Sequence, residues 1–484
     1  MESDRHRRRI SRRTFLTAAA TGVGSVALAA CGQTTAAPTT GATSPAASTA
    51  AAAAQPSASA SAAAVASTAP TPTPVVLGTG SQQVTFWHGL GGADGATMVQ
   101  MLEQYASEKP EITISSETYA WDLYYQKLPT ATAAGTPPNL GLQHQWSTKQ
   151  FAAQGLLQDA DTLFFSQGLV PKDDYNPALI EELTVDGVTQ AVPFDNAGWL
   201  NWVNTKVIKD AGLDPNNLPK NGTEFIEWAQ RIVVDENGKH PNEEGFDPDR
   251  IKIYAIYPSW PRFNIVSTIW QFGGGLFSDD GKQSLLNDPK TIAAVQYWHD
   301  LSFKHHVAPV AVPGLPPSVE LFASNSLALM WNGTWNLNFF KDNPEAMEVM
   351  QPMPLNSLAP DGKQAVRFDS HIFIVPQGVQ EQNLQAAKDL IVWLSNHAET
   401  WATSGQVPAR SSVQQQPSVQ EIPSVKVAAQ QFQEFGRAGQ SHPAINEIVT
   451  AYEAAFSAAL AGTTPPEQAM NEAHTTVQSI LDRG

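Results

Sequence analysis

The sequence contains a single cysteine, Cys31, in 484 residues. One cysteine cannot form an internal disulfide, so a disulfide-stabilised fold is excluded. Charged residues make up only 15% of the chain, and acidic residues outnumber basic ones by 46 to 29. A negative chain repels the phosphates of nucleic acids and anionic lipid headgroups, so we expect no nucleic-acid partner.

The first 31 residues are predicted to be an export signal that ends at Cys31. A basic run over residues 5–13 precedes an apolar stretch over residues 15–30. That stretch is shorter than the about 20 residues of a membrane span and is typical of a signal peptide. SRRTFL (residues 11–16) resembles the twin-arginine export motif. LAAC (residues 28–31) resembles the bacterial lipobox, which implies cleavage before Cys31 and a lipid on its sulfur.

Residues 32–78 consist almost entirely of Ala, Thr, Ser, Pro and Gly and carry no charge and no aromatic residue. Such a segment buries too little apolar surface to offset the entropy of ordering, so we predict a disordered linker.

The alternative for Cys31, an ordinary buried cysteine, is disfavoured because twin arginines, apolar stretch and lipobox follow in order. Two or three acyl chains on Cys31 would hold the protein on the outer face of the cytoplasmic membrane.

The remaining chain, about 400 residues, exceeds one hydrophobic core, so two domains are expected. Residues 82–89 alternate as in a strand, residues 94–110 have helical spacing, and residues 111–118 alternate again. This order predicts a βαβ unit and a largely parallel sheet. The last seventy or so residues have helical patterns.

Residues 1–31 hold six of the 29 basic and two of the 46 acidic residues, which leaves a net charge of −21 on the rest.

Six motifs in order resemble the carbohydrate-binding group of extracellular solute-binding proteins of ABC transporters, the group that includes maltose-binding protein. They cover most of residues 83–482, and Asn139 replaces an Asp that is usual in the second motif. The motifs are VTFWHGLGG (84–92), YYQKLPTATAAGTPPNL (124–140), FAAQGLLQDAD (151–161), AVPFDNAGWLNWVNTKVIKDAGLDP (191–215), WNGTWNL (331–337) and SGQVPARSSV (404–413).

The resemblance implies a two-lobe α/β fold of the periplasmic-binding-protein type II class, with a hinge, an interlobe cleft and a helix-rich C-terminus. The chain is expected to cross between lobes near Pro193–Trp199, near Arg367–Phe373 and again shortly after Arg410. Lobe 1 is then residues 79–195 plus 372–415, and lobe 2 is residues 196–371 plus 416–484.

The resemblance also implies a receptor that captures a sugar or oligosaccharide and delivers it to an ABC permease. The expected partners are the carbohydrate ligand, the permease subunits and the lipid bilayer through acylated Cys31. We expect a monomer that is not an enzyme and that holds no cofactor and no metal. No G-x-S-x-G, H-E-x-x-H or Walker motif is present in the sequence.

Candidate ligand residues are aromatic rings for the apolar face of a sugar and polar groups for its hydroxyls. Trp228, Trp298 and Trp393 lie among apolar neighbours on helices, and we assign them to the core. His88 and Gln145 follow predicted strands, at the carboxyl edge where α/β sheets place ligands. The predicted site is His88, Gln145, Trp146, Asp195, Asn196, Trp199, Trp270, Trp335, Asp369, His371 and Arg410.

Three alternatives stay open at this stage. Arg410 either contacts ligand, for example as the anion anchor of a glycerol-phosphate or phosphodiester receptor, or braces the hinge. Asp195 and Asp369 are the one carboxylate pair that would suit an extracytoplasmic glycan-active enzyme. Residues 235–249 contain D-x-N-G, a weak indication of a calcium loop without the regular oxygen spacing of an EF-hand.

Overall fold

A computed structural model gives the fold of residues 73–257 and 259–483. The export signal, Cys31 and residues 32–72 of the predicted linker lie outside the described residues. Val75–Gly78 form strand β1, so the folded part begins before the predicted boundary at residue 79. The apolar run Val75, Val76 and Leu77 allows this, because it pairs antiparallel with the strand that contains Ile114.

The first sheet has six strands in the order β1-β3-β2-β4-β14-β7. The predicted βαβ start is confirmed, because β2 pairs in parallel with β3 and with β4. The outer pairs are antiparallel, so the sheet is mixed, not largely parallel. Its other strands are β2 (Gln82–His88), β3 (Ile112–Thr118), β4 (Leu140–His144), β7 (Val192–Pro193) and β14 (His371–Ile374).

Helices packed around this sheet complete what we call the first lobe. In α2 (Gly95–Glu108) the buried residues Met98, Met101, Leu102 and Tyr105 recur at helical spacing and turn one face inward. The other main helices are α3 (Trp121–Ala133), α4 (Thr148–Ala153), α5 (Pro177–Glu182), α13 (Glu381–Asn396) and α14 (Ala398–Ala402). The remaining short pair is β5 (Thr184–Val185) and β6 (Val188–Thr189).

The second sheet is built on β8 (Asp195–Asn204), in which Asn196 alone is not buried. The strand pairs antiparallel with four others, so it is hydrogen-bonded over its length and buried on both faces. The order is β16-β13-β8-β11-β10-β9, with β12 and β15 also on β8. These strands are β9 (Val234–Asp235), β10 (Ile251–Ile256), β11 (Leu327–Gly333), β12 (Met350–Met353), β13 (Val366–Asp369), β15 (Val407–Pro408) and β16 (Gly436–Ala438).

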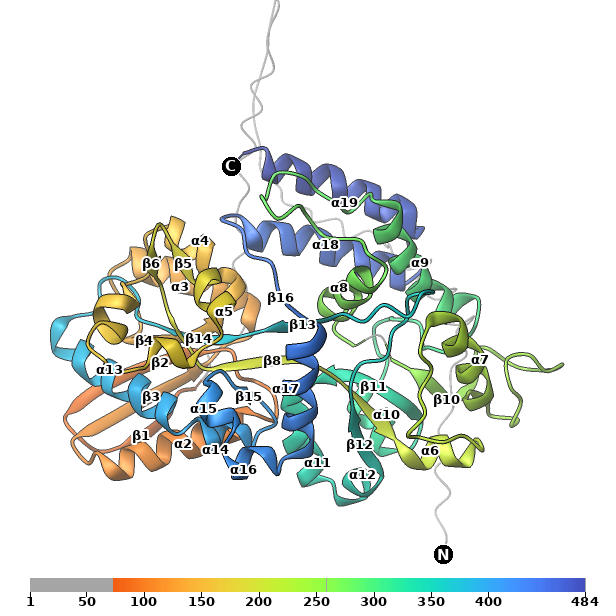
Figure 1. Cartoon of the computed structure of the whole chain (residues 1–484), viewed down its shortest axis with the longest axis horizontal. Helices are drawn as coiled ribbons and strands as arrows, with labels where there is room; N and C mark the ends of the chain where they lie inside the picture. Colours follow the sequence, from red (N-terminus) through yellow and green to blue (C-terminus); the bar gives the residue numbers. More distant parts are fainter. Residues whose placement is uncertain (1–72, 258, 484) are drawn as a thin grey trace, which may run out of the picture. The chain divides into compact units, whose positions relative to one another are not determined.

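The second lobe consists of this sheet and its helices. The C-terminal helices α18 (Ile445–Leu460) and α19 (Pro466–Leu481) pack on α8 (Pro261–Gln271) and α9 (Pro289–Phe303) (Figure 1). Asn221 caps α7 (Gly222–Ile232), because its side chain accepts from two backbone amides of the first turn. Shorter helices are α6 (Thr205–Asp210), α10 (Ser318–Ala323), α11 (Leu337–Asp342) and α12 (Pro344–Val349).

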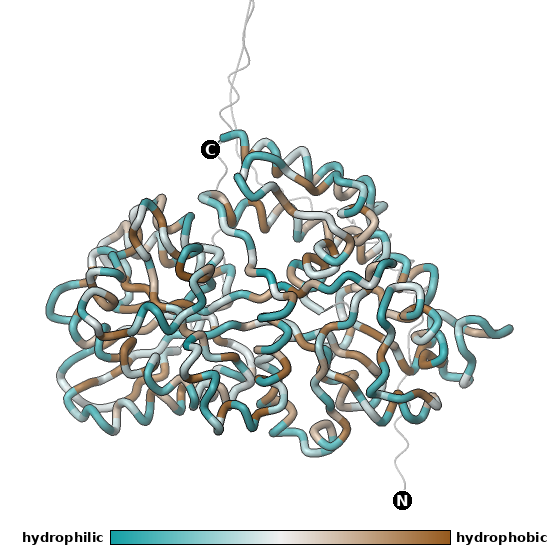
Figure 2. The backbone as a smooth tube through the Cα atoms, viewed as in Figure 1, coloured by the Kyte–Doolittle hydropathy of each residue, from teal (hydrophilic) through white to brown (hydrophobic). Residues whose placement is uncertain are grey.

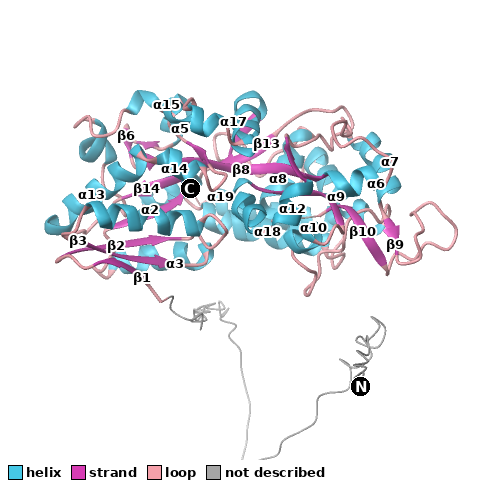
Figure 3. Ribbon diagram, turned by 90° about the horizontal axis from the view of Figure 1, so that it is seen from below, coloured by secondary structure: helices cyan, strands magenta, loops and turns pink. Residues whose placement is uncertain are grey.

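Two passages of the chain between the sheets lie within segments that the resemblance predicted. A single residue, Phe194, separates β7 from β8, and a single residue, Ser370, separates β13 from β14. After the first-lobe helix α14, the chain reaches β15 on the second sheet and continues through α15 (Ser411–Gln414), α16 (Pro417–Gln420) and α17 (Pro423–Phe435) to β16 of the same sheet. Figures 1 and 3 show β8 and β13 running where the two groups of strands meet. Two extended segments without slack are suited to act as a hinge.

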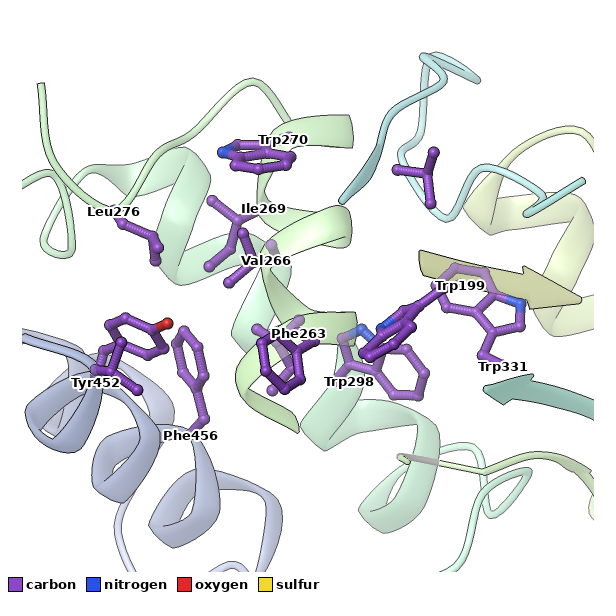
Figure 4. Packing of buried hydrophobic residues seen from close by; sticks show 14 of the residues in the cluster. Trp199, Phe263, Val266, Ile269, Trp270, Leu276, Trp298, Trp331, Tyr452 and Phe456 are labelled. Atoms are coloured by element: carbon purple, nitrogen blue, oxygen red, sulfur yellow. The ribbon is translucent and has the colours of Figure 1, made fainter. Parts of the chain in front are cut away.

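Apolar residues line the strands and the inward helix faces, and hydrophilic residues dominate the outer loops (Figure 2). Trp228, Trp298 and Trp393 are 8%, 1% and 9% exposed, so their assignment to the core is confirmed. Figure 4 shows the packing around α8, with Phe263 between Trp199 and Phe456. Within residues 73–257 and 259–483, no helix has the length and apolar character of a membrane span.

Candidate functional site

Asp195 and His371 meet where the first two crossings lie side by side. Asp195 begins β8 and is fully buried, and His371 begins β14 and is 4% exposed. The carboxylate of Asp195 accepts from His371 Nδ1 at 2.9 Å, from the His371 backbone amide at 3.0 Å and from Trp401 Nε1 at 2.6 Å. Both oxygens of Asp195 are therefore engaged by protein donors.

Gln145, directly after β4, and Asp369, the last residue of β13, join the same buried group. Gln145 donates to Asp369 at 3.2 Å and accepts from the Ser370 amide at 2.6 Å. Arg367 pairs with Asp369 at 3.1 Å, and both side chains are almost fully buried. A buried pair of this kind is costly to break, because it would leave one charge unpaired. We call Gln145, Asp195, Asp369, Ser370 and His371 the crossing floor.

His88 and Asn196 lie next to the crossing floor, and their side chains form hydrogen bonds to neighbouring protein groups. His88 is 1% exposed; its Nε2 lies 2.9 Å from Ser116 Oγ, and its Nδ1 accepts from the Leu90 amide. Burial, with the nearby charge of His371, lowers the pKa of His88 to about 3, so its ring is neutral. Asn196 accepts from the Ser370 hydroxyl at 2.7 Å. Neither nitrogen of His88 is left for a ligand.

Aromatic rings of the first lobe rise beside the crossing floor. Trp121, at the start of α3, stacks on His371 with 5.6 Å between ring centroids and an interplanar angle of 17°. It also contacts His144 at 4.3 Å, and His144 stacks on Trp146 at 5.7 Å. Tyr125 lies 4.7 Å from Trp146, and its hydroxyl is 2.6 Å from His144 Nδ1. We call Trp121, Tyr125, His144 and Trp146 the first-lobe wall.

Aromatic rings of the second lobe form a matching set. Trp199 on β8 packs edge-to-face on Phe263 at 5.2 Å and on Trp335 at 4.9 Å. Trp335 in turn lies 6.4 Å from Trp260. Trp199 is buried, Trp335 is half-buried and Trp260 is 50% exposed, so the run leads from the core to the surface. We call Trp199, Trp260, Phe263 and Trp335 the second-lobe wall.

The two walls approach each other at the loop Gly89–Gly92. A Cβ on Gly89 would lie 2.1 Å from a ring atom of Trp121, so only glycine fits beneath that indole. On the other side, the Cβ position of Gly92 lies 3.4 Å from the ring of Trp335 in the second lobe. A first-lobe loop thus lies between one tryptophan of each wall.

Polar contacts also join the two lobes directly. Arg262 of α8 lies 3.2 Å from Asp122 of α3 and 3.2 Å from Glu453 of α18. Gln150 of α4 accepts from the Asn446 backbone amide at 3.1 Å. The described arrangement is one in which the lobes touch around the crossing floor and the walls.

Two residues of the predicted site lie elsewhere in the structure. Trp270 is 4% exposed in the core around α8, with the Arg437 guanidinium 5.6 Å from its ring. Arg410 donates to Asp174 at 2.7 Å and to Asn396 at 2.8 Å. Arg410 thus braces the start of α15 against the first lobe.

Residues 235–249 show no oxygen set for calcium. The carboxylate of Asp235 accepts from the backbone amides of Asn237, Lys239 and Asp247, and it is 1% exposed. It therefore organises the turn. Among the described residues, no group of three or more His, Cys, Asp or Glu side chains could hold a metal ion.

Comparison with known families decides which class of protein carries this arrangement. The family model described as "Bacterial extracellular solute-binding protein" matches residues 90–401. The chain belongs to this family. The predicted family resemblance is thereby confirmed, and members of the family bind solutes outside the cytoplasm.

Two relatives of this solute-binding protein are named for saccharide ligands. The chain is 22% identical over 345 residues to the diacetylchitobiose binding protein DasA of Streptomyces coelicolor, covering 70% of this chain and 75% of that one. It is 23% identical over 364 residues to an arabinooligosaccharide-binding protein of Halalkalibacterium halodurans, covering 71% and 74%. A maltose-bound T. maritima MalE3 structure has a TM-score of 0.71 at 20% identity, covering 82% of this chain and 99% of the other. The two-lobe fold is therefore confirmed.

Sequence reasoning missed several residues of this solute-binding protein's walls. Trp121, His144 and Phe263 reach the site only through tertiary packing, and no motif marks them. One signal was available: the glycines at 89, 91 and 92 follow β2, and two of them lie against indole rings.

Proposed function

We propose that this protein binds a sugar or oligosaccharide between its lobes and delivers it to an ABC permease. The observation that carries the proposal is the pair of tryptophans, Trp121 and Trp335, that contact the Gly89–Gly92 loop from opposite lobes, with Trp121 stacked on His371 of the crossing floor. A pyranose has apolar faces for indole rings and hydroxyls for polar partners. Burying one aromatic ring is worth several kcal/mol gross at about 25 cal/mol per Å².

The names of two relatives support a saccharide ligand, since one is named for diacetylchitobiose and the other for arabinooligosaccharides. Their ligands differ, so the names support the class of ligand and leave its identity open. The exposed Trp260 at the outer end of the second-lobe wall favours a ligand of more than one sugar unit, since it extends the aromatic run toward the surface.

We propose lobe boundaries at residues 75–195 plus 372–415 and 196–371 plus 416–484, with the first lobe starting at β1 and not at the predicted residue 79, and with the crossings as the hinge. A ligand that touches both lobes binds only the closed state and shifts the population toward it. In this account the closed state is what the permease recognises. The protein acts as a monomer, without cofactor or metal and without a catalytic step.

The proposed anchor is a lipid on Cys31, after twin-arginine export and cleavage at the lipobox. The order of motifs in residues 11–31 supports this, as does the linker composition that follows. The folded part would then be held at the outer face of the cytoplasmic membrane, where an ABC permease receives its substrate.

The two alternative functions are less well supported. Arg410 already donates to Asp174 and Asn396, so it is not free to bind the phosphate of a glycerol-phosphate or phosphodiester ligand. Asp195 and Asp369 are 0% and 6% exposed and are held by His371, Trp401 and Arg367. A glycosidase needs two carboxylates that reach the glycosidic bond.

A thermal-shift screen against mono- and oligosaccharides tests the proposal. A ligand at 100 times its Kd stabilises the folded protein by about 2.7 kcal/mol. We expect at least one saccharide to raise the Tm of the wild type, and a smaller rise in Trp335→Ala. A panel of maltose, maltotriose, diacetylchitobiose, arabinotriose and related sugars that leaves the Tm unchanged would contradict it, as would detection of cleaved saccharide.

A further inference from the structure

The Asp195–His371 pair carries an inference about how the proposed site recognises its ligand. The two residues begin the strands β8 and β14, directly after the single-residue crossings at Phe194 and Ser370. The Asp195 carboxylate accepts from both the backbone amide and the Nδ1 of His371. His371 is thus fixed in position and in ring orientation.

The other ring nitrogen of His371 is differently placed. Nδ1 must carry a proton, because its partner is a carboxylate that only accepts. Nε2 of His371 has no hydrogen-bond partner among residues 73–257 and 259–483. The protein does not enclose this nitrogen completely. The ring itself stacks on Trp121 and contacts His144 at 4.8 Å, both members of the first-lobe wall.

Three carboxylates act on the ring of His371. Burial opposes the charged form, but Asp195, Asp94 and Asp369 outweigh it and raise the pKa of His371. Burial lowers the pKa values of the two neighbouring histidines, so those rings stay neutral. The titratable groups that face His371 are His88 on β2, Asp94 before α2, His144 on β4, Asp195 on β8 and Asp369 on β13.

We propose that Asp195 is a positioning residue that fixes the ring of His371 through its Nδ1–H, and that His371 Nε2–H donates to an acceptor oxygen of the bound saccharide beside Trp121. This rests on the proposed function for the identity of the ligand. His371 is then a specificity-determining donor, and Asp195, although fully buried, acts on the ligand only through it. Trp401 shares the carboxylate of Asp195 and weakens its hold on the histidine.

The positioning role is tested without any ligand. The pKa and protonation of His371 are followed by ¹⁵N imidazole NMR in the full chain, with the resonance assigned from His371→Gln. We expect Asp195→Asn to lower the pKa of His371, and Trp401→Phe, which frees one carboxylate oxygen, to raise it. Opposite shifts separate positioning from a general loss of structure. Amide spectra check the fold, and Trp401→Phe keeps the test available if Asp195→Asn does not fold. Equal or absent shifts would overturn the positioning role.

The donor role is tested with maltotriose, diacetylchitobiose and arabinotriose by calorimetry between pH 6 and 9. The affinity of whichever sugar binds is expected to fall about fivefold or more as pH rises through the raised pKa, because a charge-assisted bond is lost. His371→Gln keeps a donor that does not titrate, so its affinity should be independent of pH. A wild-type affinity that is flat with pH would overturn the donor role. If none of the sugars binds, the donor role falls with the proposed function, while the titration of His371 still decides the positioning by Asp195.

Discussion

Arg262 on α8 and Asp122 on α3 join the two lobes through an ion pair, with 3.2 Å between a guanidinium nitrogen and a carboxylate oxygen. The Arg262 side chain is 11% exposed, whereas that of Asp122 is 78% exposed. Solvent screens such a pair, so it contributes at most about 1 kcal/mol to closure. A contribution of that size still changes a closing equilibrium several-fold.

Arg262→Gln should therefore open the lobes without unfolding them. We expect a larger radius of gyration by X-ray scattering and about a fivefold weaker affinity for a bound saccharide at low salt, with the gap narrowing as salt rises. Arg250→Gln is the matched control, because its partner Glu236 belongs to the same lobe. Equal scattering curves for the wild type and both variants would show that the pair plays no part in closure.

Trp335→Ala should weaken saccharide binding by about 2 kcal/mol, or roughly thirtyfold, because a half-buried ring of the second-lobe wall is lost. Its effect on stability should be smaller than that of Trp270→Ala, which empties a core position and costs about 3–5 kcal/mol. Calorimetric titration and urea unfolding of both variants check this. If Trp270→Ala instead weakened saccharide binding more than Trp335→Ala did, the ligand would not bind at the second-lobe wall.

Trp260 has a left-handed backbone with φ of 46° and precedes Pro261, a combination that is costly for a residue with a Cβ. Trp260→Gly should therefore be more stable to urea than Trp260→Ala by about 1 kcal/mol, and both should bind oligosaccharides more weakly than the wild type. Met347 in α12 is a control position at a similar exposure of 42%, where glycine should be the less stable of the two. Equal stabilities at Trp260 would mean that its backbone is not strained.

Strand and helix patterns predicted much of the fold, but side-chain partners across the chain were not predictable. The alternation in Gln82–His88 and the helical spacing after it needed only local information. His88 was expected to follow a strand and is the last residue of β2, yet Ser116, 28 residues away, occupies its Nε2. Trp121 carries no local sign of its contact with His371, which is 250 positions further along the chain.

The crossings show the same division. Pro193 and the strand after it indicated an extended segment, whereas the pairing of Asp195 with His371 depends on two crossings lying side by side. Residues 75–78 show the limit of composition: the segment follows a low-complexity run, but three apolar residues are enough to add an edge strand.

Arg410→Gln should lower stability and leave saccharide affinity unchanged. Partial burial disfavours the Asp174 carboxylate, but hydrogen bonds from Ser412 and Arg410 outweigh it and lower its pKa. A carboxylate whose pKa is lowered by folding stabilises the fold at pH values above its unfolded pKa of about 3.9. This stabilisation is lost as the pH falls through the folded pKa. We expect Arg410→Gln to lower the free energy of unfolding by about 2 kcal/mol at pH 7. As the pH falls from 5 to 3, the variant should lose less stability than the wild type does. A large drop in affinity with unchanged stability would make Arg410 a ligand residue.

The central claim is that a saccharide held between the walls of the two lobes closes them, and small-angle X-ray scattering tests it most directly. The sugar that most raises the Tm is added at saturation to the wild type and to Trp335→Ala. The account predicts a smaller radius of gyration for the wild type with sugar than without it, and a reduced change in the variant at the same sugar concentration. A sugar that binds tightly and leaves the radius of gyration of the wild type unchanged would contradict it.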